Sequence, residues 1–190
     1  MNKIIILCGF SASGKDTIAQ ELSKKSYNLL VSTTSRPIRE NEKNGVDYNF
    51  VTKEEFISKI KNNEFIEHRT YDTLLKNKKE TWYYGTEFKY IEDDKPYIGV
   101  HELNGVKSLK NFYGDRIITF FISVPEFERL RRAELRGSFD KTEWDRRQKD
   151  DYNLFTIDMI DKLCNYNILN YKKGIEEVIK EIEKLIWFLL

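Results

Sequence analysis

The segment that most constrains this chain is an apolar run that leads directly into a glycine-rich loop and a lysine. Residues 4–7 are apolar and mostly β-branched, which is typical of a strand covered on both faces. The next segment, Gly9 to Lys15 with the sequence GFSASGK, has two glycines and a lysine at the spacing G-x4-G-K. Helical periodicity follows at residues 15–25. This order predicts a phosphate-binding site, because backbone N–H groups and the helix N-terminus face the anion.

Two side chains at the end of this loop are candidates for a role at the phosphates. Lys15 is placed to neutralise the β- and γ-phosphates of a bound nucleotide. The next position usually holds a Ser or Thr that binds Mg²⁺, whereas this chain has Asp16 there and Thr17 beside it. The Asp16 carboxylate is a good oxygen ligand for Mg²⁺, but it suits a helix N-terminus equally well without a metal. Both interpretations of Asp16 stay open.

Composition and charge limit the classes of function. The chain has 190 residues, of which 32 are basic and 31 acidic, and its formal net charge is +1. This length suits one compact domain with inserts, and the balanced charge argues against partners such as nucleic acid or acidic membranes. Cys8 and Cys164 lack the spacing of a metal cluster or a disulfide framework, so we expect a reduced, cytoplasmic protein. The apolar residues 185–190 are too few to span a bilayer.

Further along the chain, apolar runs alternate with helical patterns. The apolar runs at 97–100 and 117–124 predict buried strands, and 166–169 is a last strand candidate. The alternation of these segments with helices predicts a parallel α/β sheet. Residues 33–97 are rich in Tyr, Phe and Thr and predict a small insert with short strands. Helical patterns are found at 53–61, 106–111, 125–151 and 174–190.

A second motif occupies residues 32–50, with the sequence STTSRPIRENEKNGVDYNF. It resembles the guanylate kinase signature S-x-T-T-R-x-x-R-x-x-E-x-x-G-x-D-Y-x-F. The resemblance continues in the family's order at NEFIE (63–67), YGT (84–86), NGVK (104–107), residues 132–137 and Arg147. Together with the glycine loop, these matches extend over nearly the whole chain.

The resemblance implies an α/β fold, in which a P-loop NTPase parallel sheet is flanked by helices and carries a small α+β nucleoside-monophosphate-binding insert and a helical lid. It implies a P-loop core at residues 1–32, 98–125 and 151–190, the insert at 33–97 and the lid at 126–150. The implied ATP-binding residues are Gly9, Ser11, Ala12, Ser13, Gly14, Lys15, Asp16 and Thr17.

The resemblance also implies a GMP site, and the residue types agree with it. Two arginines three residues apart can present two guanidinium forks to one phosphate. A carboxylate can accept hydrogen bonds from N1–H and N2–H of guanine, whereas adenine presents a lone pair there and is rejected. By resemblance, Glu67 reads the base, Ser32 and Thr86 lie near O6, and Glu102 also touches the base. The implied GMP-binding residues are Ser32, Arg36, Arg39, Glu42, Tyr48, Glu67, Tyr84, Thr86 and Glu102.

Phosphoryl transfer depends on positioning and charge neutralisation, and a phosphate monoester needs no general base because it is already anionic at neutral pH. By resemblance, Arg136 and Arg147 are lid arginines that neutralise the migrating group. The implied catalytic residues are Lys15, Arg36, Arg136 and Arg147. The chain departs from the family at Val100, where an acidic residue is usual, and this weakens the assignment of a metal. Residues 76–80 predict an extra loop that could alter the base pocket.

The leading hypothesis is therefore a guanylate kinase that uses Mg²⁺ with ATP to phosphorylate GMP and also dGMP. The expected partners are these small-molecule nucleotides, without nucleic acid or membrane, and the protein is expected to be a monomer or a homodimer. One alternative is a related kinase that acts on another nucleoside monophosphate or a ribose bisphosphate. Another is a guanylate-kinase-like binding module with weak catalysis.

Overall fold

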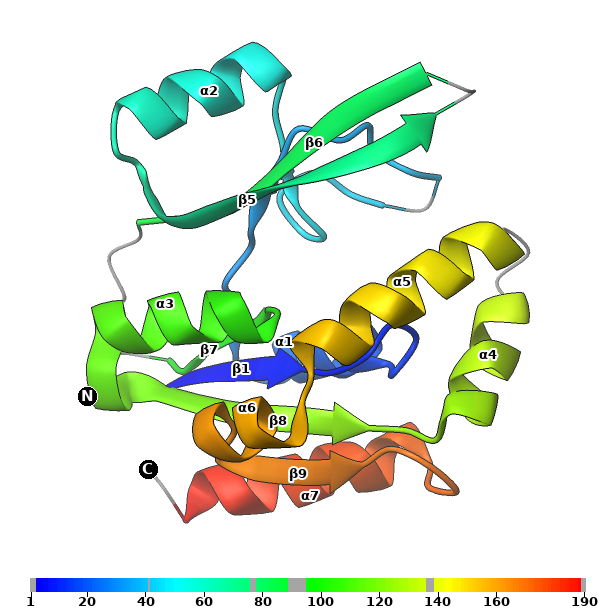
Figure 1. Cartoon of the computed structure of the whole chain (residues 1–190). Coiled ribbons are helices and arrows are strands. Elements are labelled where there is room, and N and C mark those ends of the chain that lie inside the picture. The colour runs from blue at the N-terminus through cyan, green and yellow to red at the C-terminus, as the bar shows by residue number, and fades with distance from the viewer. Residues whose placement is uncertain (1–2, 41, 76–77, 89–94, 136–138, 189–190) are drawn as a thin grey trace. The chain divides into compact units, whose positions relative to one another are not determined.

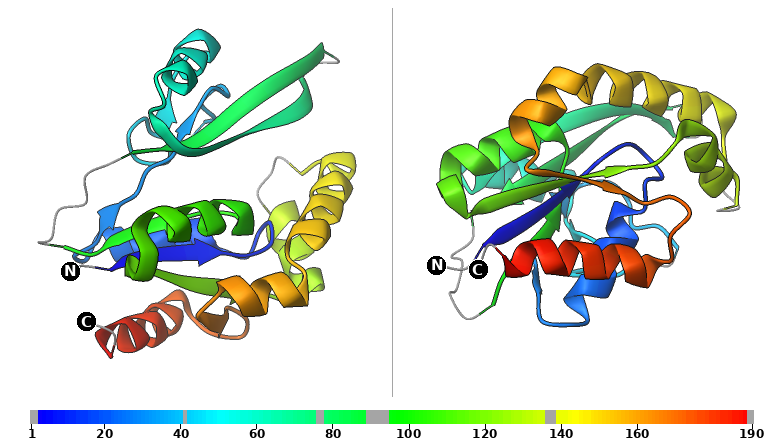
Figure 2. Two further views of the ribbon diagram at one scale, coloured as in Figure 1. Left: turned by 60° about the vertical axis from the view of Figure 1, so that its left-hand side comes forward. Right: turned by 90° about the horizontal axis from the view of Figure 1, so that it is seen from below.

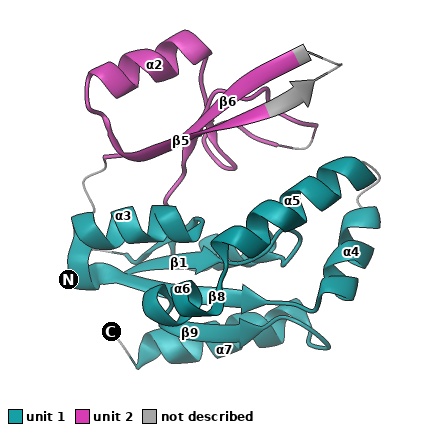
Figure 3. Cartoon of the chain, viewed as in Figure 1, with its two compact units in different colours: residues 1–28, 92–190 teal, residues 29–91 magenta. Residues whose placement is uncertain are grey.

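The computed structural model describes residues 3–40, 42–75, 78–88, 95–135 and 139–188. The chain divides into two compact units, each with its own sheet (Figure 3). Unit 1 comprises residues 1–28 and 92–190, and unit 2 comprises residues 29–91.

Unit 1 is built on a parallel sheet (Figure 1). Its strands, in spatial order, are β2 (Asn28–Leu29), β7 (Tyr97–Val100), β1 (Ile4–Cys8), β8 (Ile117–Ser123) and β9 (Tyr166–Leu169). β1 pairs in parallel with β7 and β8, and β8 pairs in parallel with β9. All five residues of β1 are fully buried, as expected for a central parallel strand covered on both faces. The predicted parallel α/β sheet is confirmed.

Helices cover both faces of this sheet (Figure 2). The helices are α1 (Lys15–Ser23), α3 (Leu103–Tyr113), the 3-10 turn η1 (Gly114–Arg116), α6 (Ile157–Leu163) and α7 (Ile175–Trp187). α1 contacts α7 on one face, and α3 contacts α6 on the other. Each long helix buries one apolar stripe, as in α7, where Val178, Ile179, Ile182 and Ile186 are buried. Within the described residues, no helix is both long and apolar enough to cross a membrane.

Two further helices of unit 1, α4 (Glu126–Glu134) and α5 (Lys141–Leu154), bury few apolar side chains. The buried residues of α4 are Glu128 and Arg129, and those of α5 are Trp144 and Gln148. α5 begins after Asp140, whose side chain accepts a hydrogen bond from the backbone N–H of Glu143. These helices belong to the segment in which the sequence predicts a lid.

The described residues of unit 2 form a four-stranded sheet and one helix. Its elements are β3 (Thr33–Thr34), β4 (Asn49–Phe50), α2 (Lys53–Lys61), β5 (Phe65–Leu75) and β6 (Lys78–Glu87), with strand order β4-β3-β6-β5. Thr52 and Glu55 form a capping box that fixes the start of α2. Phe56 of this helix is fully buried and stacks on Phe65, with 4.4 Å between the ring centroids.

The expectation of short strands holds for β3 and β4 but is wrong for β5 and β6, and residues 78–80 do not form the expected extra loop. β5 and β6 have 11 and 10 residues and form one long antiparallel hairpin. Residues 78–80 belong to β6, where they pair with residues 73–75, while 76–77 lie outside the described residues. Cross-strand contacts such as that of the Thr81 hydroxyl with Asp72, at 2.8 Å, stabilise such pairing. Residues 78–80, expected in the extra loop, therefore extend strand β6.

Candidate functional site

The phosphate loop, residues 9–15, links β1 to α1 in unit 1. Gly14 immediately precedes α1 with a left-handed φ of +88°, a conformation that favours glycine. A Cβ on Gly9 would lie 2.5 Å from the carbonyl oxygen of Ile122 on β8. The loop turns through a hydrogen bond from the Ser13 N–H to the Phe10 carbonyl, at 3.2 Å. Its course past β8 into α1 thus depends on glycine at both ends.

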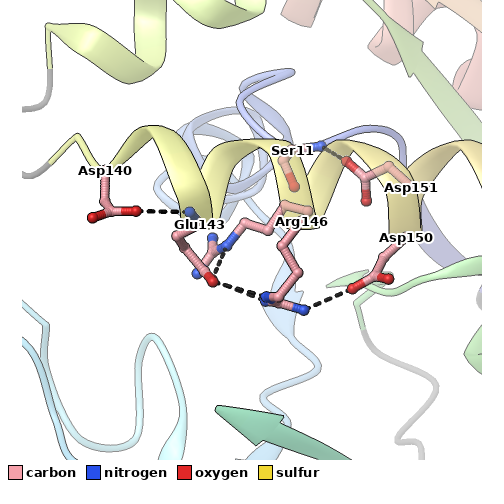
Figure 4. Close-up of polar contacts among 7 residues, drawn as sticks. Ser11, Asp140, Glu143, Arg146, Asp150 and Asp151 are labelled. Atoms are coloured by element: carbon pink, nitrogen blue, oxygen red, sulfur yellow. Dashed lines mark hydrogen bonds and ion pairs between the residues drawn. The ribbon is translucent and has the colours of Figure 1, made fainter. Parts of the chain in front are cut away.

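Residues far away in the sequence hold the backbone of this loop. The amide of Asn170 donates to the Ser13 carbonyl at 2.8 Å, and Arg132 contacts the same carbonyl at 3.4 Å. The Asp151 carboxylate accepts a hydrogen bond from the Ser11 N–H at 2.6 Å (Figure 4). Burial raises the pKa of Asp151, although the Ser11 N–H opposes that effect. Sequence reasoning missed these contacts, and only Arg132 lay within a matched motif.

The loop also carries donors suited to phosphate. The Lys15 ammonium donates to the Phe10 carbonyl at 3.3 Å. Ser13 is fully buried, and its hydroxyl has no hydrogen-bond partner among the described residues. Asp16 and Thr17 are exposed in the first turn of α1. No group of three or more metal-ligating side chains occurs in the described part of the chain, so protein groups alone do not form a closed metal site there.

A buried arginine connects α4 and α5 to the loop. Arg129 is 2% exposed, and its guanidinium lies 4.5 Å from the centre of the Phe10 ring. Its Nη1 donates to the side-chain oxygen of Gln148 on α5. Phe10 also contacts the rings of Tyr152 and Phe155, at centroid distances of 5.2 Å. Aromatic and cationic contacts of this kind fix the base of both helices against the loop.

The two arginines of α5 share one carboxylate. Arg147 donates to Glu143 at 2.7 Å. Arg146 binds Glu143 at 2.8 and 2.9 Å and Asp150 at 2.7 Å (Figure 4). The hydrogen bonds from Arg146, with a further contribution from Arg147, outweigh desolvation and lower the pKa of Glu143 to about 2. The structure thus places Arg147 on a described helix, whereas Arg136 lies outside the described residues.

In unit 2, Arg36 and Glu42 form a paired centre. Arg36 is only 4% exposed, and its two Nη atoms donate to the two oxygens of Glu42 at 2.7 and 2.5 Å. The Arg39 N–H donates to the same carboxylate at 2.9 Å. Burial opposes the charge of Glu42, but these hydrogen bonds prevail and lower its pKa. The Arg36 guanidinium also lies over the rings of Tyr48 and Phe50, at 5.1 and 5.3 Å.

This geometry differs from two guanidinium forks presented to one phosphate. Arg36 has both Nη atoms on Glu42, and only Arg39 is exposed. Tyr48 and Tyr84 lie together beside this centre, with ring centroids 5.9 Å apart. The structure therefore brings these predicted phosphate-binding residues to one place on unit 2, with Glu42 at its centre.

Glu67 forms the other end of this surface. Its Oε1 accepts a hydrogen bond from the hydroxyl of the buried Thr86 at 2.7 Å, and its Oε2 lies 3.8 Å from Nη1 of Arg69. Sequence reasoning missed Arg69 and also Tyr71, whose ring lies 5.4 Å from that of Tyr84. Contacts run without interruption through Glu67, Arg69, Tyr71, Tyr84, Tyr48, Arg36 and Glu42. We call these seven residues the acceptor face.

Two further predicted residues are Ser32 and Glu102. Ser32 belongs to unit 2, is half-buried and precedes β3, where its carbonyl accepts a hydrogen bond from the Asn49 N–H at 2.9 Å. Glu102 belongs to unit 1, where it is the N-terminal cap residue of α3. Glu102 and Glu67 are thus on different units. Val100, the departure from the family pattern, ends β7 in unit 1.

A family model described as guanylate kinase matches residues 1–188. The chain belongs to the guanylate kinase family. The guanylate kinase of Bacteroides thetaiotaomicron is 36% identical over 188 residues, which cover 94% of this chain and 89% of that protein. The guanylate kinase of Porphyromonas gingivalis is 37% identical over 146 residues, which cover 73% of this chain and 74% of that protein.

A solved structure supports the same assignment. The crystal structure of guanylate kinase from Anaplasma phagocytophilum matches with a TM-score of 0.67 and 26% identity, over 97% of this chain and 84% of that one. The reaction of the guanylate kinase family is phosphorylation of GMP by ATP, and the chain is a nucleoside monophosphate kinase. The predictions of family, fold class and enzyme class are confirmed.

Proposed function

We propose that this guanylate kinase transfers the γ-phosphoryl of ATP to GMP, with the phosphate loop of unit 1 as its ATP site and the acceptor face of unit 2 as its GMP site. Family membership supports the overall reaction. The observation that carries the assignment of residues is the acceptor face itself. It joins a carboxylate at one end, Glu67, to an arginine and tyrosine cluster at the other, around Arg36.

The carboxylate end suits guanine. The Thr86 hydroxyl holds one oxygen of Glu67 at 2.7 Å, and the side chain is only 12% exposed. A carboxylate oriented in this way can accept hydrogen bonds from N1–H and N2–H of guanine, which lie on one edge of the base. Adenine presents a lone pair at N1, so it would leave the carboxylate unpaired and desolvated, a combination that polar sites reject strongly.

The arginine end suits the phosphate of GMP. Arg39 is exposed beside the Arg36–Glu42 pair, and the hydroxyls of Tyr48 and Tyr84 are further donors at this end. Arginine and phosphate form strong charge-assisted hydrogen bonds. In this assignment, Glu42 positions the guanidinium of Arg36 and the N–H of Arg39, and Arg39 supplies the accessible charge.

On unit 1, the loop N–H groups, the Ser13 hydroxyl and Lys15 would bind the ATP phosphates. Arg147, together with Arg136, would neutralise charge on the migrating phosphoryl. The acceptor phosphate is the nucleophile and is already anionic at neutral pH, so no protein base is assigned.

We propose Mg²⁺ as the ion that accompanies ATP. Mg²⁺ usually binds one or two carboxylates together with the phosphates of the substrate, and the exposed carboxylate of Asp16, next to Lys15, fits that requirement. Val100 offers no oxygen on its side chain, so Asp16 would be the principal protein ligand. The ion would supply positive charge to the phosphates. We also propose a cytoplasmic location, where both nucleotides are available and the two free cysteines stay reduced.

The test is an ADP-release assay with ATP, Mg²⁺ and a panel of acceptors: GMP, dGMP, AMP, CMP, UMP and ribose bisphosphate. We expect turnover with GMP and dGMP and a rate near that of an ATP-only control with the others. Absence of turnover with GMP would overturn the proposal, and turnover with ribose bisphosphate instead would move the assignment to a different acceptor.

A further inference from the structure

An arginine that no motif predicted lies beside the carboxylate assigned to guanine. Glu67 and Arg69 are two residues apart on β5, so both side chains emerge from the same face of the sheet. Arg69 Nη1 lies 3.8 Å from Glu67 Oε2, with side chains 27% and 12% exposed. At this distance the contact is an ion pair and exceeds the length of a hydrogen bond. Across the hairpin, Arg69 pairs in register with Tyr84 of the acceptor face.

One of the two hydroxyls that the resemblance places near O6 of guanine, that of Thr86, is already engaged. Thr86 is 1% exposed, and its single hydroxyl proton is donated to Glu67 Oε1 at 2.7 Å. A hydroxyl has only one proton to donate. Thr86 therefore orients the carboxylate and has no second proton for O6. A hydrogen bond to O6 beside Glu67 must therefore come from Ser32, the other hydroxyl that the resemblance implies, or from another donor on this face.

The guanidinium of Arg69 has the required chemistry. The recognition edge of guanine presents two donors, N2–H and N1–H, followed by the acceptor O6. A carboxylate next to a guanidinium presents the complementary order of acceptors and donors, and arginine is a common donor to guanine O6. Adenine places an amino group at position 6, so its N–H donors would face the donors of Arg69.

We propose that Arg69 is a second base-recognition residue, which donates a hydrogen bond to O6 of GMP and strengthens the discrimination against AMP. This inference rests on the proposed assignment of Glu67 to guanine. Tyr71 holds the guanidinium from its other side, with Arg69 Cζ 5.8 Å from the centre of the Tyr71 ring. The arginine thus acts from within the acceptor face and touches the base directly.

The test compares Arg69→Ala and Arg69→Lys with the wild-type enzyme on three acceptors. GMP and inosine 5′-monophosphate both carry O6, whereas 6-thioguanosine 5′-monophosphate keeps N1–H but has sulfur, a weak acceptor, in place of O6. We expect Arg69→Ala to lower kcat/KM about 10- to 100-fold for the first two, the range of a lost hydrogen bond to a charged group. With the thio nucleotide, kcat/KM of Arg69→Ala should stay within about twofold of the wild-type value for the same nucleotide. Arg69→Lys keeps one cationic donor and should recover part of the loss.

Thr70→Ala is the matched control, because Thr70 is an exposed neighbour on the opposite face of β5 and should behave as wild type. An equal loss for all three nucleotides would overturn the proposal, since it would mean that Arg69 only supports the pocket. Unchanged GMP kinetics in Arg69→Ala would also overturn it. If Arg69→Ala fails to fold, Arg69→Gln replaces it. Failure of the wild-type enzyme to use GMP would instead contradict the proposed function.

Discussion

The phosphate loop of unit 1 and the acceptor face of unit 2 are positioned by different kinds of contact. The loop is held through its backbone, because Asn170, Arg132 and Asp151 all bind main-chain atoms of Ser11 or Ser13. The acceptor face is held through pairs of side chains, of which Arg36–Glu42 is the most buried. The geometry of the phosphate loop should therefore be sensitive to changes in backbone conformation. The geometry of the acceptor face should be sensitive to changes in side-chain charge and hydrogen bonding.

The largest expected effect on turnover comes from Arg147. It lies on unit 1, but its assigned role depends on its side chain and not on the backbone, so it tests the limit of the contrast between the two regions. Arg147→Ala should lower kcat by about 10³-fold or more, the range for an arginine that neutralises a migrating phosphoryl. The thermal midpoint should change little, since its ion pair with Glu143 is partly exposed. Steady-state ADP release and thermal unfolding measure the two quantities.

The matched control for this prediction is Arg146→Ala. Arg146 binds the same Glu143 and also Asp150, yet it has no assigned role at the phosphates. Its replacement should leave kcat within about twofold, because exposed ion pairs contribute little. Equal losses in the two variants would remove Arg147 from the catalytic assignment.

Glu67→Gln tests the acceptor face at its base end. The amide of Gln would turn an N–H donor toward the donors of guanine, so kcat/KM for GMP should fall about 100-fold or more. KM for ATP should stay close to wild type, because Glu67 belongs to unit 2 and the phosphate loop to unit 1. Unchanged GMP kinetics would exclude Glu67 from the base site.

Gly14→Ala tests the dependence of the loop on its backbone. At φ +88°, an alanine is strained, and its Cβ would lie 2.8 Å from Nδ2 of Asn170. Displacement of the loop by an ångström is enough to lower kcat/KM for ATP about 100-fold. The strain should also reduce the free energy of unfolding by about 1–3 kcal/mol, measured by urea denaturation.

Gly114→Ala separates the effect of backbone strain from the effect of a steric clash with Asn170. Gly114 also has a positive φ, +60°, but a Cβ there would meet nothing within 4 Å. It should lose stability with little change in kcat/KM for ATP. If both variants lose activity equally, the contact of the loop with Asn170 is not what positions it.

The contrast between backbone and side-chain positioning also explains what the sequence could predict. The apolar run at 97–100 identifies a buried parallel strand. Both β7 (Tyr97–Val100) and β9 (Tyr166–Leu169) have the predicted bounds, although only Ile168 of β9 is buried. The capping box at Thr52 and Glu55 likewise marks the start of α2, whose predicted bounds, 53–61, are confirmed. Local patterns suffice where the determinants are local.

The long hairpin and the contacts to the phosphate loop depend on residues distant in sequence. The sequence of β5 contains polar side chains such as Glu67 and Arg69 on the same face. It has no regular apolar stripe from which the length of the strand could be predicted. Asn170 is 157 residues from Ser13, so no local pattern relates them. Motifs therefore identified groups with assigned chemistry, such as Glu67, but not groups that position the site, such as Asn170, which binds the Ser13 carbonyl.

Glu42→Gln should have a moderate effect, on stability more than on turnover. Arg36 is 4% exposed and has both Nη atoms on Glu42, so loss of the negative charge leaves a buried cation uncompensated. The free energy of unfolding, measured by urea denaturation, should fall by about 2 kcal/mol. KM for GMP should rise about tenfold.

Glu64→Gln is the control, because Glu64 pairs with Lys59 at 2.9 Å on a more exposed surface of unit 2. Its free energy of unfolding should change by less than about 1 kcal/mol. If Glu42→Gln were no more costly than Glu64→Gln, the acceptor face would not depend on its buried charge pair, and the contrast with the phosphate loop would fail.

The smallest effects are expected in acid, from two carboxylates of α5 with opposite pKa shifts. The pKa of Glu143 is lowered from 4.5 to about 2, so its contribution to stability is present above 4.5 and is lost as the pH falls toward 2. Burial raises the pKa of Asp151 above 3.8, so the folded state binds that proton more tightly and gains stability as the pH falls through this range. Thermal midpoints between pH 6 and 3 should therefore fall less steeply in Glu143→Gln than in wild type, and more steeply in Asp151→Asn. If the curves of both variants were parallel to that of wild type, protonation of these two carboxylates would not affect stability in this pH range. Burial of the Asp151 carboxylate beside the Ser11 N–H would then carry no measurable cost in stability.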